Sequence, residues 1–462
     1  MCLCVVITAM RPVQSIRNGL ERDFSHAIGW GLFSYLQERY EFSMQTVALI
    51  LFIIMYVCMI AFSKIRPYLA LGCAVLFLIL GIEPLGALPT SINWNILLML
   101  AGTMGTVQLF IESKMPNRLA DTLLASTSNV MWAAVLMSLF SGFVSAFMDN
   151  VATVLMIAPV GLAVARTLGI SPIPLLISIS VSSNLQGAAT LVGDTTSIML
   201  GGYAGMDFSD FFFMNGRFSI FWAVELGAVA TVPVIIWIFR KNRQKISGIS
   251  ITQVTDYFPT CLLLVNILLL IGASFIPEKP DLTNGLICMS ICLIGTARHL
   301  LRKGKIQTVL EGIDWQTLLL LTGLFIVIDG ITQVGIIDQI AQLFVRLGGS
   351  SKFIMYTLIT FGSVLFSAFI DNIPYVATML PVVQGISSIM GWDPTVLYFG
   401  LLCGATLGGN LTPIGASANI VTIGMLRKEG YEVKTSDFLR IGVPFTLVAV
   451  LSGYLFCWLV WA

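Results

Sequence analysis

Two Asp-Asn pairs lie inside long apolar stretches of this chain, and they are the residues best placed to do chemistry. The first pair belongs to the phrase SAFMDN, which ends at Asn150, and the second to SAFIDN, which ends at Asn372. A carboxylate at the centre of a bilayer costs about 2.5–3.5 kcal/mol or more when it faces lipid. Two such costs at matching points of one chain indicate a site that handles ions.

The two phrases belong to an internal duplication. Residues 145–160 align without a gap with residues 367–382, which lie 222 positions further on, and 8 of these 16 positions are identical. The same offset aligns Thr190 with Thr412 and Gly193 with Gly415. Two matched halves with polar groups in an apolar setting are typical of a transporter whose binding site lies between its repeats.

Four groups of polar residues form the predicted binding site for the substrate and its coupling ion. Two groups surround the Asp-Asn pairs and two lie in Gly-rich breaks: Asp149, Asn150 and Thr153; Asp371 and Asn372; Ser183, Asn184, Thr190, Gly193 and Asp194; Asn410, Thr412, Gly415 and Asn419. Carboxylate and carbonyl oxygens suit Na⁺, while the N-termini of broken helices attract anions. The combination suits a site that takes a small ion together with a cation.

Two further acids lie within predicted spans, Glu225 and Asp329. Either could be a proton relay, and either could be a hydrogen-bonded structural group. Their repeat positions are not acidic, since Asp329 aligns with Gln108. No Lys or Arg lies near the middle of a predicted span, so a multiply charged anion would depend on helix dipoles, amides and a co-bound cation.

The composition sets the class of protein. Hydrophobic residues make up 57% of the 462 residues, charged residues 11%, and the mean hydropathy is +0.91, whereas a soluble domain has about 25% charged residues. We therefore expect an integral, multi-pass protein of a bacterial-type plasma membrane. The net charge of +1 and the lack of a long basic run exclude a nucleic-acid partner. The sequence has no P-loop, nucleophile triad or metal-ligand spacing, so we expect neither an enzyme nor a cofactor or metal.

Hydrophobic runs of about 20 residues mark the membrane spans. The clearest are 45–63, 67–83, 94–111 and 214–240, matched in the second half by 256–275, 282–297, 315–333 and 438–461. The stretches 114–127 and 335–348 resemble interfacial helices. We interpret 130–168 and 352–390 as re-entrant hairpins with Asp-Asn at the tip, and 172–202 and 395–426 as helices broken within the membrane, where irregular backbone requires a protein or wet environment.

These elements predict an all-α polytopic membrane protein built from two inverted repeats of about five spans, each with a re-entrant hairpin and a broken helix. Repeat 1 covers 45–240, a cytoplasmic linker covers 241–255, and repeat 2 covers 256–462. Residues 1–44 form an N-terminal tail. The tail either contains an interfacial helix, with Phe24, Ile28 and Leu32 on one face, or precedes a true translation start at Met44.

The motifs SAFMDNVATVLMIAPV, SSNLQGAATLVGD, SAFIDNIPYVATMLPVV and GATLGGNLTPIGASANIVTIG carry a resemblance. Over about residues 45–462 the chain resembles the ion-transporter superfamily of arsenite permeases, NhaD-type sodium/proton antiporters, P-protein-like permeases and divalent-anion:sodium symporters, which share a citrate-transporter-like domain. The resemblance implies an elevator mechanism, often in a homodimer, with the site at the hairpin tips and helix breaks.

The motifs also depart from two members of the superfamily. Arsenite and P-protein-type permeases usually follow the first Gly-Asp with Pro-Pro-Asn, whereas here Thr195, Thr196 and Ser197 follow. The dicarboxylate symporters carry paired Ser-Asn-Thr signatures, whereas Ser183-Asn184 occurs once and precedes Leu185. The motifs therefore identify the superfamily and leave the substrate open.

The leading hypothesis is a secondary active transporter of a small inorganic or organic anion, coupled to Na⁺ or H⁺. The alternative is a sodium/proton antiporter, which three buried acids without a basic partner would suit. A third hypothesis is arsenite export, because Cys403 lies near the second break and thiolates bind soft metalloids. The expected partners are a small ionic substrate, the lipid bilayer and a second copy of the chain.

The distribution of Lys and Arg predicts the orientation. One side of the predicted membrane collects 17 of these residues and the other side four, apart from the tail, and the rich side is cytoplasmic by the positive-inside rule. Single cysteines in the loops 241–255 and 298–313 should therefore resist an impermeant external thiol reagent, and a cysteine in 84–93 should react. Labelling of 241–255 with protection of 84–93 would contradict the inverted-repeat prediction.

Overall fold

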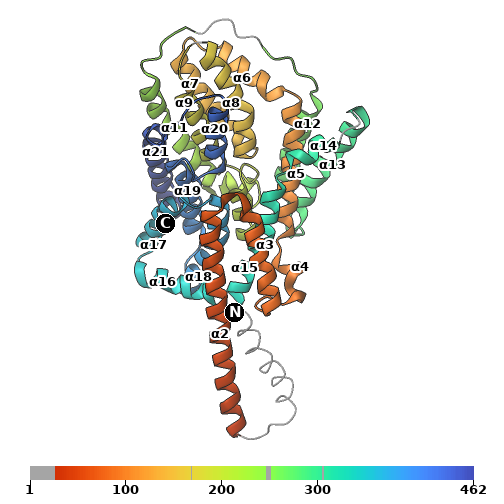
Figure 1. Ribbon diagram of the computed structural model, residues 1–462, viewed down its shortest axis with the longest axis vertical. Helices are drawn as coiled ribbons and strands as arrows, with labels where there is room; N and C mark the ends of the chain where they lie inside the picture. The colour runs from red at the N-terminus through yellow and green to blue at the C-terminus, as the bar shows by residue number, and fades with distance from the viewer. Residues whose placement is uncertain (1–26, 168, 246–250, 304–305) are drawn as a thin grey trace. The chain divides into compact units, whose positions relative to one another are not determined.

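The computed structural model describes residues 27–167, 169–245, 251–303 and 306–462, most of which are helical (Figure 1). Its longer helices are α2 (Ala27–Ala61), α3 (Arg66–Leu80), α5 (Trp94–Glu112), α6 (Met115–Ala125), α7 (Val130–Ser145), α8 (Asn150–Thr167), α9 (Pro172–Gln186), α10 (Thr195–Ala204), α11 (Ile220–Phe239), α12 (Phe258–Ala273), α13 (Thr283–Lys303), α15 (Trp315–Gln333), α16 (Ile336–Gly348), α17 (Lys352–Ser367), α18 (Asn372–Met390), α19 (Thr395–Gly408), α20 (Ser417–Lys428) and α21 (Thr435–Trp461).

Short elements complete the fold. They are α4 (Leu88–Ser91), α14 (Gln307–Gly312), the 3₁₀ turns η1 (Ser63–Ile65), η2 (Leu85–Ala87), η3 (Ser209–Phe211) and η4 (Gly409–Leu411), and the strands β1 (Phe213–Met214) and β2 (Arg217–Phe218). The prediction of an all-α polytopic membrane protein is confirmed. The inverted orientation of the repeats and the re-entrant nature of the hairpins stay predictions.

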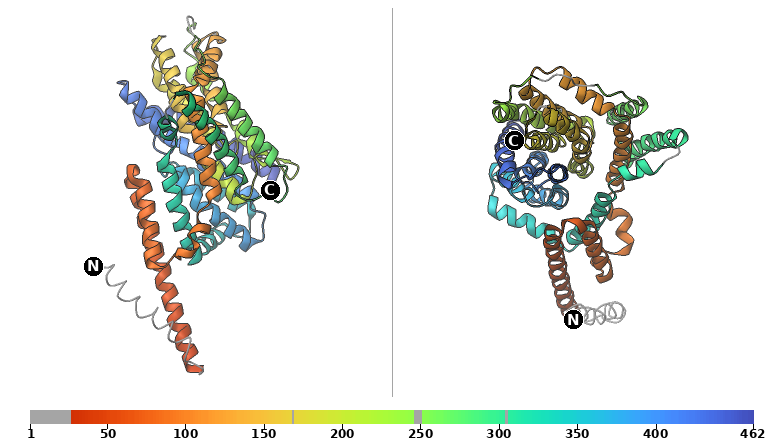
Figure 2. Two further views of the ribbon diagram at one scale, coloured as in Figure 1. Left: turned by 90° about the vertical axis from the view of Figure 1, so that its right-hand side faces the viewer. Right: turned by 45° about the horizontal axis from the view of Figure 1, so that its top comes forward.

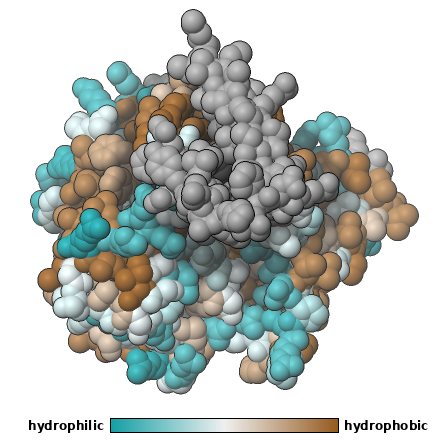
Figure 3. Space-filling model, turned by 90° about the horizontal axis from the view of Figure 1, so that it is seen from below, coloured by the Kyte–Doolittle hydropathy of each residue, from teal (hydrophilic) through white to brown (hydrophobic). Residues whose placement is uncertain are grey.

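Seven helices in the described part are long and apolar enough to cross a membrane: Ser43–Ala61, Trp94–Glu112, Ile220–Phe239, Thr283–Arg302, Trp315–Gln333, Asn372–Met390 and Thr435–Trp461. The predicted spans 67–83 and 256–275 correspond to α3 and α12, which have only 15 and 16 residues. Large apolar side chains are exposed along many of these helices, and Figure 3 shows brown apolar surface between teal hydrophilic residues.

One predicted span is wrong at its start. We expected a helix from residue 214, but β1 and β2 form a short antiparallel hairpin there, and α11 begins only at Ile220. Asn215 and Gly216 form the turn and have φ of 52° and 73°. Asn-Gly is the sequence that favours positive φ at both central positions of a hairpin turn, so the signal was present within the apolar run.

The boundary predicted at residue 44 is not a helix end. α2 begins at Ala27 and continues without a break to Ala61. Phe24 lies outside the described residues. Whether residues 1–44 lie at the interface therefore stays a prediction.

The described chain divides into two compact units, and each combines segments of both predicted repeats. One unit takes residues up to Ile92 together with Thr322–Ile340, and the other takes Asn93–Leu321 together with Ala341–Ala462. In the first unit α3 packs closely on α15, because a Cβ at Gly323 would lie 2.7 Å from the backbone of Ala70. Small residues allow this close helix packing in membrane proteins.

The second unit contains an equivalent helix pair. α5 and α13 pack together with α12 beside them (Figure 2), and a Cβ at Gly102 would lie 2.4 Å from the backbone of Cys288. Gly102 aligns with Gly323 in the duplicated sequence. The main core of this unit lies between α7, α8, α9, α11, α20 and α21, and it surrounds the segments that carry the predicted site.

The first unit also buries a carboxyl group. Glu83 is fully buried in the turn after α3, where it accepts hydrogen bonds from Ser91 Oγ at 2.6 Å and from Gln333 Nε2 at 2.9 Å. The same Gln333 amide donates to Asp329 at 3.1 Å. Burial raises the pKa of Glu83 to about 7. The hydrogen bond from Ser91 opposes this shift, and the charge of Asp329 adds to it.

Stability should therefore depend on pH through Glu83. A carboxyl whose pKa is raised by folding holds its proton more tightly in the folded state, so its contribution is complete below its unfolded pKa and is lost as pH rises towards 7. The apparent Tm of wild type in detergent should fall by a few degrees more between about pH 5 and pH 8 than that of Glu83→Gln. Parallel pH profiles for the two proteins would contradict this assignment.

Candidate functional site

Each Asp-Asn pair lies in a short turn between two helices. The first turn joins α7 to α8 and the second joins α17 to α18, and α7 and α17 cover residues that align at the 222-residue offset. The predicted helix breaks are present as well. Helical structure stops at Gln186 and resumes at Thr195, and it changes to the turn η4 at Gly409 before α20 begins at Ser417.

Asp149 caps the N-terminus of α8. Its Oδ2 accepts hydrogen bonds from the backbone N–H groups of Val151 at 2.9 Å and Ala152 at 3.0 Å. Thr153 Oγ1 donates to the backbone carbonyl of Asp149 at 3.0 Å, so Thr153 supports the turn. The positive end of α8 stabilises the carboxylate charge, and Asp149 remains half-buried.

Asp194 caps α10 in a comparable way and is buried. Its Oδ1 accepts from the backbone N–H of Thr195 at 2.7 Å, and its Oδ2 accepts from Thr196 Oγ1 at 3.3 Å and from Asn150 Nδ2 at 3.4 Å. Because Asn150 follows Asp149 directly, the first turn and the first helix break meet at these two carboxylates.

Asparagine side chains connect the two copies of the repeat. Asn150 Nδ2 donates to Asn184 Oδ1 at 2.9 Å, while Asn184 Nδ2 donates to the Thr406 carbonyl at 2.7 Å and to Asn410 Oδ1 at 3.0 Å. Asn410 in turn donates to the Val181 carbonyl at 2.9 Å. Asn184 and Thr406 are equivalent positions of the two copies, so the network lies where the copies meet.

The second copy adds its own polar residues. Ser417 Oγ donates to Asp371 Oδ2 at 3.2 Å. Asn419 Oδ1 accepts from Ser180 at 2.7 Å, and its Nδ2 donates to the Gly409 carbonyl at 3.1 Å. With its amide nitrogen facing inward, Asn372 donates to the carbonyls of Ala405 and Gly415 at 3.2 Å each.

Some predicted residues hold the backbone. Thr190 Oγ1 donates to the Ala146 carbonyl, and Thr412 Oγ1 donates to the Ala368 carbonyl, which is the equivalent contact. Ser183 Oγ donates to the carbonyl of Asn150 at 3.1 Å. These three hydroxyls therefore tie each helix break to the neighbouring turn.

Gly193 and Gly415 lie against backbone carbonyl oxygens. A Cβ at Gly193 would lie 2.5 Å from the oxygen of Gly187, 2.8 Å from that of Ala146 and 3.0 Å from that of Ser145. A Cβ at Gly415 would meet three carbonyl oxygens at the aligned positions, at 2.7 to 2.9 Å: Gly409, Ser367 and Ala368. Only glycine allows this approach in either copy.

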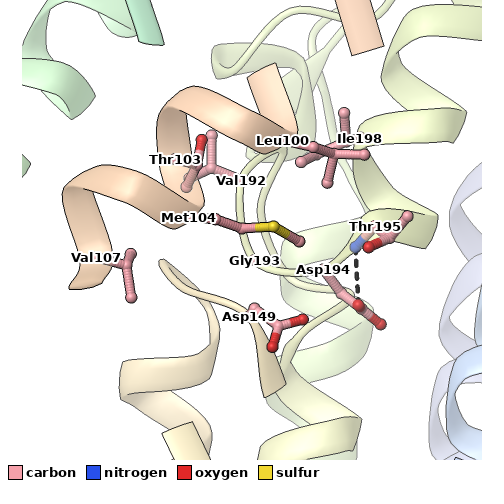
Figure 4. Close-up of a pocket in the computed structure, with 10 residues that line it drawn as sticks. All are labelled: Leu100, Thr103, Met104, Val107, Asp149, Val192, Gly193, Asp194, Thr195 and Ile198. Carbon is pink, nitrogen blue, oxygen red and sulfur yellow. Dashed lines mark hydrogen bonds between the residues drawn. The ribbon is translucent and has the colours of Figure 1, made fainter. Parts of the chain in front are cut away.

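A small cavity borders both acids of the first copy (Figure 4). Its volume of about 10 Å³ is enough for one water-sized group, and α5 contributes Leu100, Thr103, Met104 and Val107 to the wall opposite Asp149 and Asp194. A larger cavity of about 620 Å³ also reaches Asp149 and is bordered by Glu311 and Asp314.

The electrostatics of the site are unbalanced. The charges of Asp149 and Asp371 both act on Asp194. Among ion pairs between described residues, none includes Asp149 or Asp194. No group of three or more His, Cys, Asp or Glu residues able to hold a metal occurs in the described part. The arrangement can offer a carboxylate-rich environment to a monovalent cation or a proton.

The two other acids lie apart from this network. Glu225 is half-buried on α11, and no hydrogen bond joins it to the residues above, while Asp329 belongs to the other compact unit. Ser180, Thr103 and Ser417 also belong to the site or its border and were not among the predicted residues. Ser417 could have been found, since it aligns with Thr195 beside Asp194, but Ser180 and Thr103 lie in ordinary helix positions that carry no local signal.

The sequence profile of the citrate transporter family matches residues 47–404. The chain belongs to this family. An uncharacterized transporter of Mycobacterium tuberculosis is 30% identical to this family member over 442 residues, which cover 90% of this chain and 98% of that protein. The P protein of Mus musculus is 26% identical over 456 residues, which cover 78% of this chain and 53% of that protein. The chain is thus an integral membrane transporter, as predicted, and not an enzyme.

Solved structures support the fold of this family member. The YdaH transporter of Alcanivorax borkumensis matches with a TM-score of 0.56 and 13% identity, over 80% of this chain and 86% of that one. MtrF of Neisseria gonorrhoeae, described as illuminating a class of antimetabolite efflux pumps, matches with a TM-score of 0.52 and 15% identity, over 83% and 82%. At these identities the likeness concerns the fold alone.

The carbonyl-lined glycines give a direct test of the local geometry. Gly193→Ala and Gly415→Ala should each abolish transport and lower stability by about 1–3 kcal/mol, because overpacking against backbone cannot be relieved by a rotamer change. Gly424→Ala is the matched control, since a Cβ at Gly424 meets no atom within 4 Å. Thermal unfolding in detergent and flux in proteoliposomes measure both effects. Normal flux in both site variants would contradict the described packing.

Proposed function

We propose that the protein is a secondary active transporter of a small anion, inorganic or organic, coupled to Na⁺ or H⁺. One observation carries the proposal: Asp149 and Asp194, which form no ion pair with a basic residue of the described chain, lie in a network that also contains the N-termini of four helices. The carboxylates favour a cation, and the helix N-termini favour an anion.

The cation fits the first copy of the repeat. Asp149 and Asp194 repel one another, and binding of Na⁺ or a proton relieves this repulsion. Oδ2 of each carboxylate already accepts two hydrogen bonds, so the Oδ1 atoms of Asp149 and Asp194 offer the acceptor capacity for a ligand. The coupling ion would therefore bind between the first turn and the first helix break.

The anion fits the second copy of the repeat. No side-chain hydrogen bond caps α20, whose N-cap residue is Ala416. The corresponding helix of the first copy, α10, is capped by Asp194. A helix N-terminus without a capping carboxylate is available to a substrate anion. The family description, citrate transporter, supports a carboxylate among the candidate substrates.

The larger cavity offers the cation a route. Its border includes Asp149, Glu311 and Asp314 and has no Lys, Arg or His. A cleft lined by one sign of charge raises the local concentration of the opposite ion. This cavity would therefore draw cations towards Asp149.

Sodium/proton antiport is the alternative. The mutual repulsion of Asp194 with Asp149 and Asp371 favours it, since such acids can exchange Na⁺ for H⁺ without a second substrate.

Arsenite export has less support. The Cys403 thiol points to α21, because a Cβ at Gly453 would lie 3.3 Å from its sulfur, and so it packs away from the helix break.

We extend the proposal to the mechanism that the resemblance implies. The site would cross the membrane by an elevator-type movement, and the protein would work as a homodimer. Cysteine cross-links that trap the site-bearing helices at two depths, with loss of flux on cross-linking, would support the movement. Single-molecule photobleaching in nanodiscs would test the dimer.

Removing single charges tests the coupling site. Asp149→Asn and Asp194→Asn should each reduce flux at least tenfold, because Asn retains size and can still cap a helix but lacks the charge that binds the cation. Flux of radiolabelled citrate, phosphate and sulfate into proteoliposomes, under separate Na⁺ and H⁺ gradients, is the measurement. Thermal stability should change by about 1 kcal/mol or less.

Asp393→Asn is the matched control for these variants. Asp393 is an exposed acid that accepts the backbone N–H of Thr395 at 2.8 Å at the start of α19, so it has the capping role without the site. Its replacement should leave flux unchanged. If the site variants retain normal flux and cation dependence, Asp149 and Asp194 are not in the coupling site. If only Na⁺/H⁺ exchange is seen and no anion moves, the antiporter alternative replaces the proposal.

A further inference from the structure

A basic cavity lies at the ends of three helices, apart from the network described above. It has a volume of about 400 Å³ and lies between the start of α9, the end of α11 and the first turns of α21. Its lining residues include Trp237, Arg240, Lys241, Asp437 and Arg440. All belong to the same compact unit.

The positive charges of this cavity are not neutralised within the described part of the protein. Arg240, Lys241 and Arg440 take part in none of the ion pairs found there. The single acid in the lining, Asp437, is engaged with the backbone N–H of Lys434 at 3.3 Å. The N-terminus of α9 adds a positive partial charge. The cavity therefore attracts an anion.

A tryptophan beside the cavity indicates the level at which the cavity lies relative to the membrane. The guanidinium of Arg240 lies over the ring of Trp237, 5.3 Å from its centroid, and Trp237 is exposed on the side of α11. Tryptophan beside basic residues at the end of a spanning helix is typical of the membrane interface. Arginine forms paired hydrogen bonds to phosphate oxygens.

Exposed apolar side chains continue from the basic residues along the surfaces of α11 and α21. On α11, Leu226 and Val229 are exposed and share a helical face with Trp237, and on α21, Leu447 and Leu451 are exposed in register with Arg440. α11 and α21 pack against each other and are both long enough to span a membrane. Exposed apolar surface that continues from a basic cavity fits acyl chains below a charged headgroup.

We propose that this cavity binds the headgroup of an anionic phospholipid. Arg240, Lys241 and Arg440 bind the phosphate, Trp237 lies at the level of the glycerol, and the acyl chains run along the exposed faces of α11 and α21. A free phosphate ion would use the same basic residues but not the exposed apolar side chains, which is why the lipid is the ligand inferred.

Native mass spectrometry of the purified full chain, titrated with dioleoyl-phosphatidylglycerol or dioleoyl-phosphatidylcholine, tests this proposal. Wild type should bind phosphatidylglycerol in preference to phosphatidylcholine. Arg240→Gln with Arg440→Gln should weaken phosphatidylglycerol binding about tenfold or more and leave phosphatidylcholine binding unchanged. The variant Arg240→Lys with Arg440→Lys keeps the charge and should retain most of the binding, which separates charge from folding.

A second double variant serves as the control. Arg243→Gln with Lys245→Gln removes the same charge from exposed positions just beyond α11 that do not line the cavity, and its lipid binding should equal that of wild type. Equal loss of phosphatidylglycerol in both Gln variants would overturn the proposal, because general surface charge would then explain the effect. Displacement of the lipid by an equal concentration of inorganic phosphate would overturn it in favour of a free-anion site.

Discussion

The site depends on one constraint: a helix that stops inside an apolar protein leaves backbone polar groups that only the protein can satisfy. Here the carbonyls at the ends of α7 and α17 lie against Gly193 and Gly415, and the threonines Thr190 and Thr412 donate to them. The same solution appears in both copies of the repeat. The contact of Asn150 with Asp194 joins the turn and the helix break that this packing holds together.

The two copies have kept the same backbone contacts but differ in charge. Asp194 aligns with Ala416, and Asn184 aligns with Thr406. One copy therefore has two carboxylates at its helix N-termini, whereas the other has only Asp371, and Ala416 stands at the N-terminus of α20. A duplicated scaffold with unequal charge can offer different environments to two ions.

The duplication made much of this site predictable. Because both copies repeat at one offset, the turns and Asn150 could be predicted from the sequence. Asn184 and Asn410 have no asparagine at the equivalent position and were predicted from the Gly-rich breaks in which they lie. Ser180 could not be predicted, because a serine in a continuous helix gives no sign of a partner 239 residues away. The hairpin at Asn215 lies within an apolar run, so composition alone predicts a helix there in spite of the Asn-Gly signal. The grouping of helices into units depends on packing between segments distant in sequence, which periodicity does not report.

The side chain of Asn184 has a consequence for how the two halves communicate. Its oxygen accepts from Asn150 in one copy, while its nitrogen donates to Thr406 and Asn410 in the other. The amide cannot turn over, because that would place acceptor against acceptor on one side and donor against donor on the other. A ligand that moves Asn150 must therefore strain the bonds to Thr406 and Asn410. By thermodynamic reciprocity, a ligand bound in the second copy would change affinity in the first by the same factor, so this one amide would link the occupancy of one half to that of the other.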